Sequence, residues 1–292
     1  MNWPLKVFRA FALAVILLYG AICAVLWIFQ RHMIFFPGRI VELTPKDFGS
    51  QFESVGVREN SGETIRGWWI PAANPDCALV FLHGNGGNIG DNAEQGVRLA
   101  RLGCSVLLLD YRGYGESDGK FPSESSVYKD AEASWDYAIS RGYKASQIVI
   151  YGHSLGGAIA IELACHHSGA RELIVESSFT SALEMADSRR LYHLFPIPWL
   201  LTERFDSLSK LPRIHLPVLF IHGTADQIVP TFMGERLYEA ANPPKRLVLI
   251  AGGHHEDSAK IGGELYSASV SAFLKTGETV GSQTQTTTLD KR

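Results

Sequence analysis

The chain has 292 residues, of which 46% are hydrophobic and 20% are charged, so it holds enough apolar material for a sizeable buried core. Its net charge of -3 gives no electrostatic footprint for nucleic acid. The four cysteines show neither CxxC nor metal-ligand spacing. We therefore expect a globular protein without a metal or other cofactor, whose cysteines are unpaired packing residues. A bridge between Cys77 and Cys104 remains an open alternative.

The N-terminal segment is the first predicted element. Residues 10–29 carry no charge, and twenty helical residues span the roughly 30 Å hydrocarbon core of a bilayer. Lys6 and Arg9 would also fit the positive end of a cleaved signal peptide, but the apolar stretch is long and no small-residue cleavage site ends it. The sequence therefore predicts an uncleaved signal anchor over residues 1–32 and a membrane location.

Charges on either side of this segment bear on its orientation. Lys6, Arg9 and the terminal amino group flank one end, whereas Arg31 and Arg39 flank the other. The slightly greater charge at the first end favours a cytoplasmic N-terminus. The remainder of the chain would then lie on the non-cytoplasmic side.

Behind the anchor, apolar runs typical of strands alternate with helical patterns, which predicts an α/β fold over residues 33–276. The strands form a mostly parallel eight-stranded sheet flanked by helices, and a turn at 59–63 makes the first two an antiparallel edge hairpin. The expected strands lie near 52–57, 64–70, 78–82, 105–109, 147–151, 172–176, 217–221 and 246–250. The expected helices lie near 91–102, 123–141, 154–168, 231–241 and 258–275.

A glycine-rich loop, residues 83–88, follows the strand at 78–82. Glycines allow backbone N–H groups to approach a substrate carbonyl, so we assign one oxyanion donor to the N–H of Asn85. A phosphate-binding loop is disfavoured, because the segment has no lysine and no G-x-x-x-x-G-K-[ST] pattern.

The pentapeptide at 152–156 has the pattern G-x-S-x-G and lies between an apolar strand and a helix of small residues. This context is typical of a nucleophile elbow, in which a serine occupies a strained strand-to-helix corner. Ser154 is therefore the predicted nucleophile. The N–H of Leu155, the next residue, is the predicted second oxyanion donor.

A serine nucleophile requires a base and an acid that orients it. Asp226 follows the strand at 217–221 and is the predicted acid, with Glu176 as its rival. The next strand runs into Gly252 and Gly253, followed by two histidines. We assign the base to His254 because it directly follows the glycine turn, and His255 remains the alternative. Adjacent side chains rarely converge on one ion, so a metal site at these histidines is disfavoured.

Two segments lie outside this scheme. The insertion at about 179–212 is too long for a simple crossover and is apolar at 191–201, so we expect a cap over the active site that lines an acyl-binding cleft or touches the bilayer. Packing on the core is the alternative. The tail at 277–292 is rich in Thr, Gln and Ser and is expected to be disordered.

These motifs occur in one order along the chain and cover roughly residues 50 to 275. Together they resemble the α/β-hydrolase superfamily, and within it the membrane-anchored abhydrolase-domain proteins of the bud-emergence type. The segments that carry the resemblance are residues 83–88, 110–117, 152–157, 205–208 and 221–226. One departure is His255, because relatives commonly have Asn or another non-basic residue after the catalytic histidine.

The resemblance implies a serine hydrolase with Ser154, Asp226 and His254 as its triad. Some relatives act on fatty-acyl thioesters or lipid esters, which makes a small-molecule or lipid acyl compound the expected substrate. We therefore predict cleavage of an ester or thioester through an acyl-enzyme. A serine peptidase of the same fold and a non-catalytic membrane-tethered binding protein are the alternatives. The oligomeric state is left open.

Overall fold

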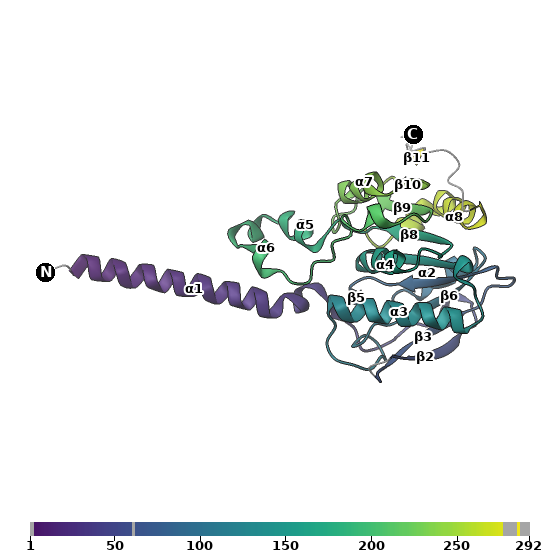
Figure 1. Ribbon diagram of the computed structural model, residues 1–292, viewed down its shortest axis with the longest axis horizontal. Coiled ribbons are helices and arrows are strands. Elements are labelled where there is room, and N and C mark those ends of the chain that lie inside the picture. The colour runs from purple at the N-terminus through teal and green to yellow at the C-terminus, as the bar shows by residue number, and fades with distance from the viewer. Residues whose placement is uncertain (1–2, 60–61, 277–284, 287–292) are drawn as a thin grey trace.

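The computed structural model describes residues 3–59, 62–276 and 285–286. Its body is a nine-stranded sheet with helices on both faces, and a long N-terminal helix extends away from it (Figure 1). Two short strands, β1 (Phe36–Pro37) and β5 (Gly86–Gly87), form a separate parallel pair. The strand order across the sheet is β11-β10-β9-β8-β7-β4-β6-β3-β2. The strands are β2 (Glu53–Arg58), β3 (Thr64–Ile70), β4 (Cys77–Leu82), β6 (Cys104–Leu109), β7 (Ile148–His153), β8 (Glu172–Glu176), β9 (Val218–Gly223), β10 (Lys245–Ile250) and β11 (Gln285–Thr286).

The pairing confirms the predicted α/β architecture. β2 and β3 form the antiparallel edge hairpin, β3 pairs antiparallel with β6, and the other pairs are parallel. Each of the eight expected strands is present to within about two residues. The main helices are α2 (Ala93–Ala100), α3 (Glu124–Ser140), α4 (Leu155–His166), α7 (Thr231–Ala240) and α8 (Ser258–Thr276).

The core has two layers, one on each face of the sheet. Alternate residues of a strand point to opposite faces, so Val80 and Ile150 join one apolar cluster while Leu79 and Val149 join the other. Helices α3, α4 and α7 contribute to the first cluster, and α2 and α8 to the second. Because both faces are covered, β4, β6 and β7 are buried along their whole length.

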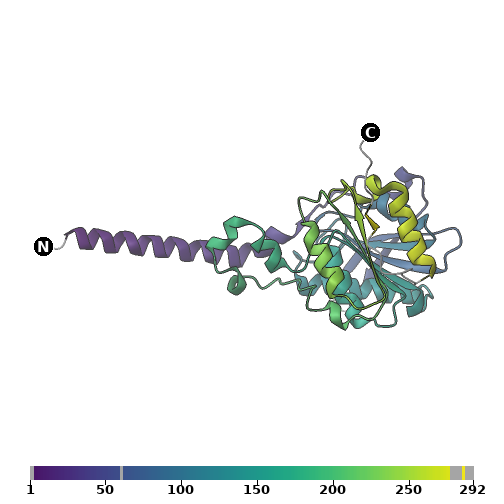
Figure 2. The same cartoon turned by 90° about the horizontal axis from the view of Figure 1, so that it is seen from above.

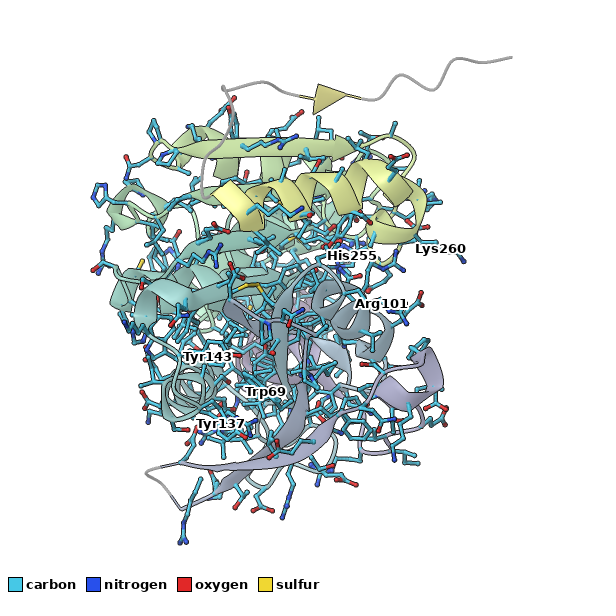
Figure 3. All side chains as sticks on the ribbon, turned by 90° about the vertical axis from the view of Figure 1, so that its right-hand side faces the viewer. Trp69, Arg101, Tyr137, Tyr143, His255 and Lys260 are labelled. Carbon is cyan, nitrogen blue, oxygen red and sulfur yellow. A yellow bond between two sulfur atoms is a disulfide. The ribbon has the colours of Figure 1, made fainter. Side chains whose placement is uncertain are left out.

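An aromatic group closes the edge of the first layer. Trp69 of β3 lies against Tyr137 of α3 and Tyr143, with ring centroids 6.4 and 5.7 Å apart, and the three are labelled together in Figure 3. The guanidinium of Arg141 lies 4.8 Å from the Trp69 ring, in cation–π geometry. These contacts fix α3 against the hairpin edge.

The N-terminal helix α1 (Trp3–Ile34) is long and apolar enough to cross a membrane, as the sequence predicts. No residue in its most apolar window is buried. Its C-terminal half lies beside a small helical segment made of α5 (Ala182–Asp187), a 3-10 turn (Arg190–Leu194) and α6 (Ile197–Leu200), and the two views agree on this (Figures 1 and 2).

Two expectations need correction. Cys77 and Cys104 are not unpaired: they start the adjacent strands β4 and β6 at paired positions, with Cα atoms 4.7 Å apart, and form a disulfide. Sequence spacing alone could not show that pairing. Part of the C-terminal tail also lies in the sheet, since β11 pairs with β10 as a ninth strand. The rest of the expectation for residues 277–292 falls outside the described residues.

Candidate active site

Ser154 lies at the corner between β7 and α4, with φ 54° and ψ -119°. This left-handed conformation is strained for a non-glycine residue and is the geometry of a nucleophile elbow. A Cβ at Gly156 would come within 1.9 Å of the Leu82 carbonyl oxygen, and one at Gly152 within 2.1 Å of the Gly156 oxygen. Only glycine fits at either position, which is why the pattern needs both.

A continuous hydrogen-bond chain links Ser154, His255 and Asp226. The Nε2 atom of His255 lies 2.9 Å from the Ser154 hydroxyl, and its Nδ1 atom lies 2.8 Å from the Asp226 carboxylate. All three side chains are largely buried. Because a carboxylate only accepts, Nδ1 carries the proton and Nε2 is left to accept from the serine. This is the arrangement of a Ser-His-Asp triad.

The expectation that His254 is the base is wrong in this geometry. His254 is exposed, and its backbone N–H donates to the Asp257 carboxylate at 2.6 Å. The loop after β10 turns here, so the two adjacent histidines point in different directions. His255 alone faces the serine. Its carbonyl also accepts from His153 Nε2 at 3.0 Å, which fixes the loop against the elbow.

Asp226 occupies the predicted position after β9. One carboxylate oxygen accepts from the N–H groups of Ile228 and Val229, and the other faces His255 and, at 3.4 Å, His222. Burial alone raises the pKa of Asp226, but hydrogen bonds from His222, His255 and Val229 outweigh burial and hold the pKa below its usual range. The carboxylate therefore stays ionised, as the orienting acid of a triad must.

Glu176, the alternative candidate for the acid, makes no hydrogen bond to His255 and lies in the core instead. Its carboxylate accepts from the hydroxyls of Tyr151 and Tyr266 at 2.5 and 2.7 Å, inside the second core layer. Deprotonating either tyrosine beside this carboxylate and out of water is unfavourable, so burial raises the pKa of both well above its usual value. Glu176 is a structural acceptor there.

The glycine-rich loop after β4 lies against the elbow. A Cβ at Gly84 would lie 3.5 Å from Ser154 Cβ. The ring of His83 donates from Nδ1 to the Gly84 carbonyl at 2.8 Å. Since the C=O and N–H of a trans peptide point in opposite directions, this bond turns the N–H of Asn85 away from the His83 ring. Asn85 and Leu155 line one cavity with Ser154.

Residues 110–115 support that loop through hydrogen bonds. Tyr114 donates to the Asn85 carbonyl at 2.7 Å, and Tyr111 donates to the His83 carbonyl at 2.9 Å. Arg112 pairs with the Asp130 carboxylate at 2.6 Å and also with Glu59 and Glu63. These bonds hold the loop backbone still beside the serine.

The cavity beside Ser154 has a volume of about 460 Å³ and is mainly apolar. Three regions build it: the end of α1, the segment at 179–205, and the loops beside the serine. Its lining residues are Leu26, Gln30, Met33, Ile34, Asn85, Ser154, Leu155, Phe179, Ala182, Met185, Ala186, Arg189, Leu191, Tyr192, Ile197, Leu200, Leu201, Phe205, Ile228 and Val229. The contribution of α1 was not predicted, because no local pattern in an apolar helix reveals it.

One group in the described part of the chain has metal-ligand spacing. Ligand atoms of His153, His255 and Glu256 lie within 4.8 Å of one another. However, His255 is already bonded to Ser154 and Asp226, and His153 Nε2 must carry a proton to donate to a carbonyl. An ion at this place would compete with the triad contacts.

Comparisons with known proteins bear on the family and the fold. A family model described as "Serine aminopeptidase, S33" matches residues 73–210. An uncharacterised protein of Mycobacterium tuberculosis is 33% identical over 89% of this chain and 92% of its own length. The human alpha/beta hydrolase domain-containing protein 17B is 32% identical over 70% of this chain and 69% of its own.

Two further likenesses concern sequence and fold. The Arabidopsis thaliana alpha/beta hydrolase domain-containing protein WAV2 is 30% identical over 86% of this chain and 89% of its own. A Pyrococcus furiosus esterase has a similar fold, with a TM-score of 0.68, 22% identity, and coverage of 83% of this chain and 97% of the esterase. The strand order, the serine elbow and the similarity to these relatives together show that the chain belongs to the α/β-hydrolase superfamily.

Proposed function

We propose that the protein is a serine hydrolase that cleaves carboxylic esters or thioesters with an apolar acyl chain. The observation that carries this proposal is the Ser154–His255–Asp226 hydrogen-bond chain at an apolar cavity. Nothing in the packing of the fold requires a serine, a histidine and an aspartate to meet there. Their alignment is what nucleophilic acyl transfer needs.

The reaction proceeds in two steps. His255 Nε2 takes the Ser154 proton as the oxygen attacks the acyl carbonyl, and the N–H groups of Asn85 and Leu155 stabilise the resulting oxyanion. The imidazolium then gives its proton to the leaving alcohol or thiol, which leaves the acyl group on Ser154. His255 then deprotonates a water molecule, which attacks the acyl-enzyme, and the imidazolium returns the proton to the Ser154 oxygen as the acid leaves. Asp226 stays ionised throughout and holds the ring in position.

The lining of the cavity favours an acyl chain as the bound group. Arg189 is the only charged side chain among the described residues that line it, and no carboxylate does. An aminopeptidase must bind the ammonium group of its substrate, which calls for a negative or strongly accepting site. The cavity offers apolar surface in its place, and its volume is in the range of small-molecule pockets.

A serine peptidase is the second candidate, because the matching family model carries that description. The two candidates differ in a simple assay: the peptidase would hydrolyse aminoacyl p-nitroanilides better than p-nitrophenyl esters. A tethered binding protein without catalysis would hydrolyse neither.

The domain organisation and location form part of the proposal. Residues 1–32 anchor the protein in a membrane, residues 33–276 form the hydrolase domain with 179–212 as its cap, and the domain faces the non-cytoplasmic side. The exposed apolar surface of α1 supports the anchor. The Cys77–Cys104 disulfide supports the non-cytoplasmic location of the domain, because such bonds persist in oxidising compartments.

The test is active-site labelling of the full chain in detergent micelles with a fluorophosphonate probe. Wild type is compared with Ser154→Ala, and with Ser134→Ala as a matched control, since Ser134 is a buried serine of α3 whose hydroxyl donates to the Asp130 carbonyl of its own helix. We expect labelling that is lost in Ser154→Ala alone, together with hydrolysis of p-nitrophenyl butyrate. A folded wild type that neither labels nor hydrolyses this ester would overturn the proposal.

A further inference from the structure

The C-terminal end of α1 contacts the candidate active site at three places. First, it forms part of the cavity wall. Leu26, Gln30, Met33 and Ile34 recur at i, i+4, i+7 and i+8, so they share one face of the helix, and all four line the cavity. Elsewhere α1 is mostly exposed, whereas Gln30 is buried and Leu26 and Ile34 are partly buried. A helix serving only as a tether would need no such face.

The second place is the contact of Gln30 with the cap. Gln30 is the only buried polar residue in the described part of α1. Its Oε1 atom accepts from the N–H of Thr202 at 2.7 Å and from the N–H of Glu203 at 3.2 Å. Its Nε2 atom donates to the carbonyl of Leu200 at 3.3 Å. One side chain therefore fastens the end of the cap to the helix.

The third place is the oxyanion loop. The Ile34 carbonyl, at the end of α1 where carbonyls lack helical partners, accepts from the Asn85 side chain at 2.7 Å. The N–H of Phe36 donates to the Asn85 carbonyl at 2.9 Å. The residue assigned as an oxyanion donor is thus held by the segment that leaves the apolar helix.

The cap also contacts the middle of α1. Tyr19 donates to the Leu194 carbonyl at 3.1 Å, and its ring stacks on Phe195 with centroids 5.8 Å apart. Tyr19 precedes Gln30 by about 16 Å of helix. The cap and the apolar helix therefore run side by side over that length (Figures 1 and 2). A bilayer around α1 would also meet the exposed side chains of Leu194 and Trp199, which are 65% and 88% exposed.

We propose that the apolar helix is itself a wall of the acyl-binding subsite, and that a long-chain acyl substrate enters between α1 and the cap from the bilayer that holds α1. This deepens the proposed function and rests on it. The ligand class is an amphiphile: its acyl chain lies along Leu26 and Met33, and its ester or thioester carbonyl reaches Ser154. Gln30 is a positioning residue, which keeps the cap closed on that chain.

The test measures chain-length selectivity of the full chain in micelles, as the ratio of kcat/KM for p-nitrophenyl dodecanoate to that for p-nitrophenyl butyrate. Leu26→Trp and Met33→Trp fill the subsite. Ile28→Trp is the matched control, because Ile28 lies on the same helix, is 57% exposed and does not line the cavity. We expect the ratio to fall by about tenfold or more in the first two variants and to be unchanged in the control.

Gln30→Leu tests the cap contact. We expect a higher KM for the dodecanoate with little change in its kcat, and faster proteolysis within 187–203, because the N–H groups of Thr202 and Glu203 lose their acceptor. Equal ratios in Leu26→Trp, Met33→Trp and Ile28→Trp would overturn the inference. That outcome differs from failure of the proposed function, in which wild type fails to hydrolyse even the butyrate. Fluorophosphonate labelling of each variant shows that it is folded.

Discussion

The Nε2 atom of His255 lies 2.9 Å from the hydroxyl oxygen of Ser154, although 101 positions separate the two residues along the chain. The neighbouring His254 is exposed and makes no comparable contact. Two adjacent residues of one type therefore have different surroundings, which makes them a matched pair for mutagenesis.

His255→Ala is expected to lower kcat for p-nitrophenyl butyrate by roughly 10⁴ to 10⁶, because it removes the ring nitrogen that lies within hydrogen-bond distance of the Ser154 hydroxyl. His254→Ala should leave kcat close to that of wild type. The measurement is steady-state hydrolysis, with circular dichroism to confirm folding. A large loss in His254→Ala with an active His255→Ala would contradict the assignment of the base.

Asp226→Asn is expected to lower kcat by about 10⁴, because the amide favours the wrong tautomer of His255. Since the pKa of Asp226 is held below its usual range, protonation of this carboxylate should not limit activity in mild acid. Glu176→Gln is the control, since Glu176 bonds Tyr151 and Tyr266 in the core. It should keep kcat/KM near the wild-type value and lower only the melting temperature. The idea fails if Glu176→Gln is the inactive variant.

Gly156→Ala is expected to lower the free energy of unfolding by on the order of 3 kcal/mol and to abolish labelling of Ser154, because the new methyl group would overlap the Leu82 carbonyl oxygen. Gly169→Ala adds the same methyl group where its nearest neighbour is Ala145 Cβ at 3.6 Å, an ordinary contact. Urea unfolding of both variants in micelles gives the comparison. Equal stability of the two would show that the elbow tolerates a side chain.

Glu172 predicts a pH dependence of stability. Burial raises the pKa of this carboxyl to about 7, with Arg171 opposing and Asp76 adding to the shift. The folded protein keeps the proton up to about pH 7, whereas the unfolded chain releases it above about pH 4.5. Stability therefore falls as pH rises between these values, by about 3 kcal/mol in total from this group.

Glu172→Gln should remove that fall, so the variant becomes more stable than wild type at pH 8 while the two are similar at pH 4.5. Glu94→Gln, at an exposed position, should keep the wild-type pH profile. Unfolding curves at pH 4.5, 6 and 8 provide the measurement. Parallel profiles of wild type and Glu172→Gln would show that this carboxyl is not the cause.

The Cys77–Cys104 disulfide closes a loop with a sequence separation of 27, which the chain-entropy model values at roughly 3.6 kcal/mol. Replacing both residues by alanine should lower the melting temperature under oxidising conditions. Cys165→Ala, which removes a free cysteine, should change it much less. If reductant leaves the wild-type melting temperature unchanged, the bond either is absent or adds no stability.

Patterns within single segments predicted most of this fold. Apolar strand runs, glycine positions and the places of Ser154 and Asp226 just after predicted strands each depend on neighbours a few residues away. For that reason the predicted sheet, the predicted elbow and the predicted position of Asp226 agree with the structure.

Other features depended on how distant segments meet. Sequence order alone could not choose between His254 and His255, because adjacent residues in an irregular loop point in directions set by the turn and by the bond from His153. The Cys77–Cys104 pairing depended on β4 lying next to β6. The place of α1 in the cavity wall is likewise tertiary, since an apolar helix face predicts burial but does not say against what. Local periodicity is a property of the sequence itself. Which segment packs against a given surface depends on the tertiary structure, because it brings together residues that are distant along the chain.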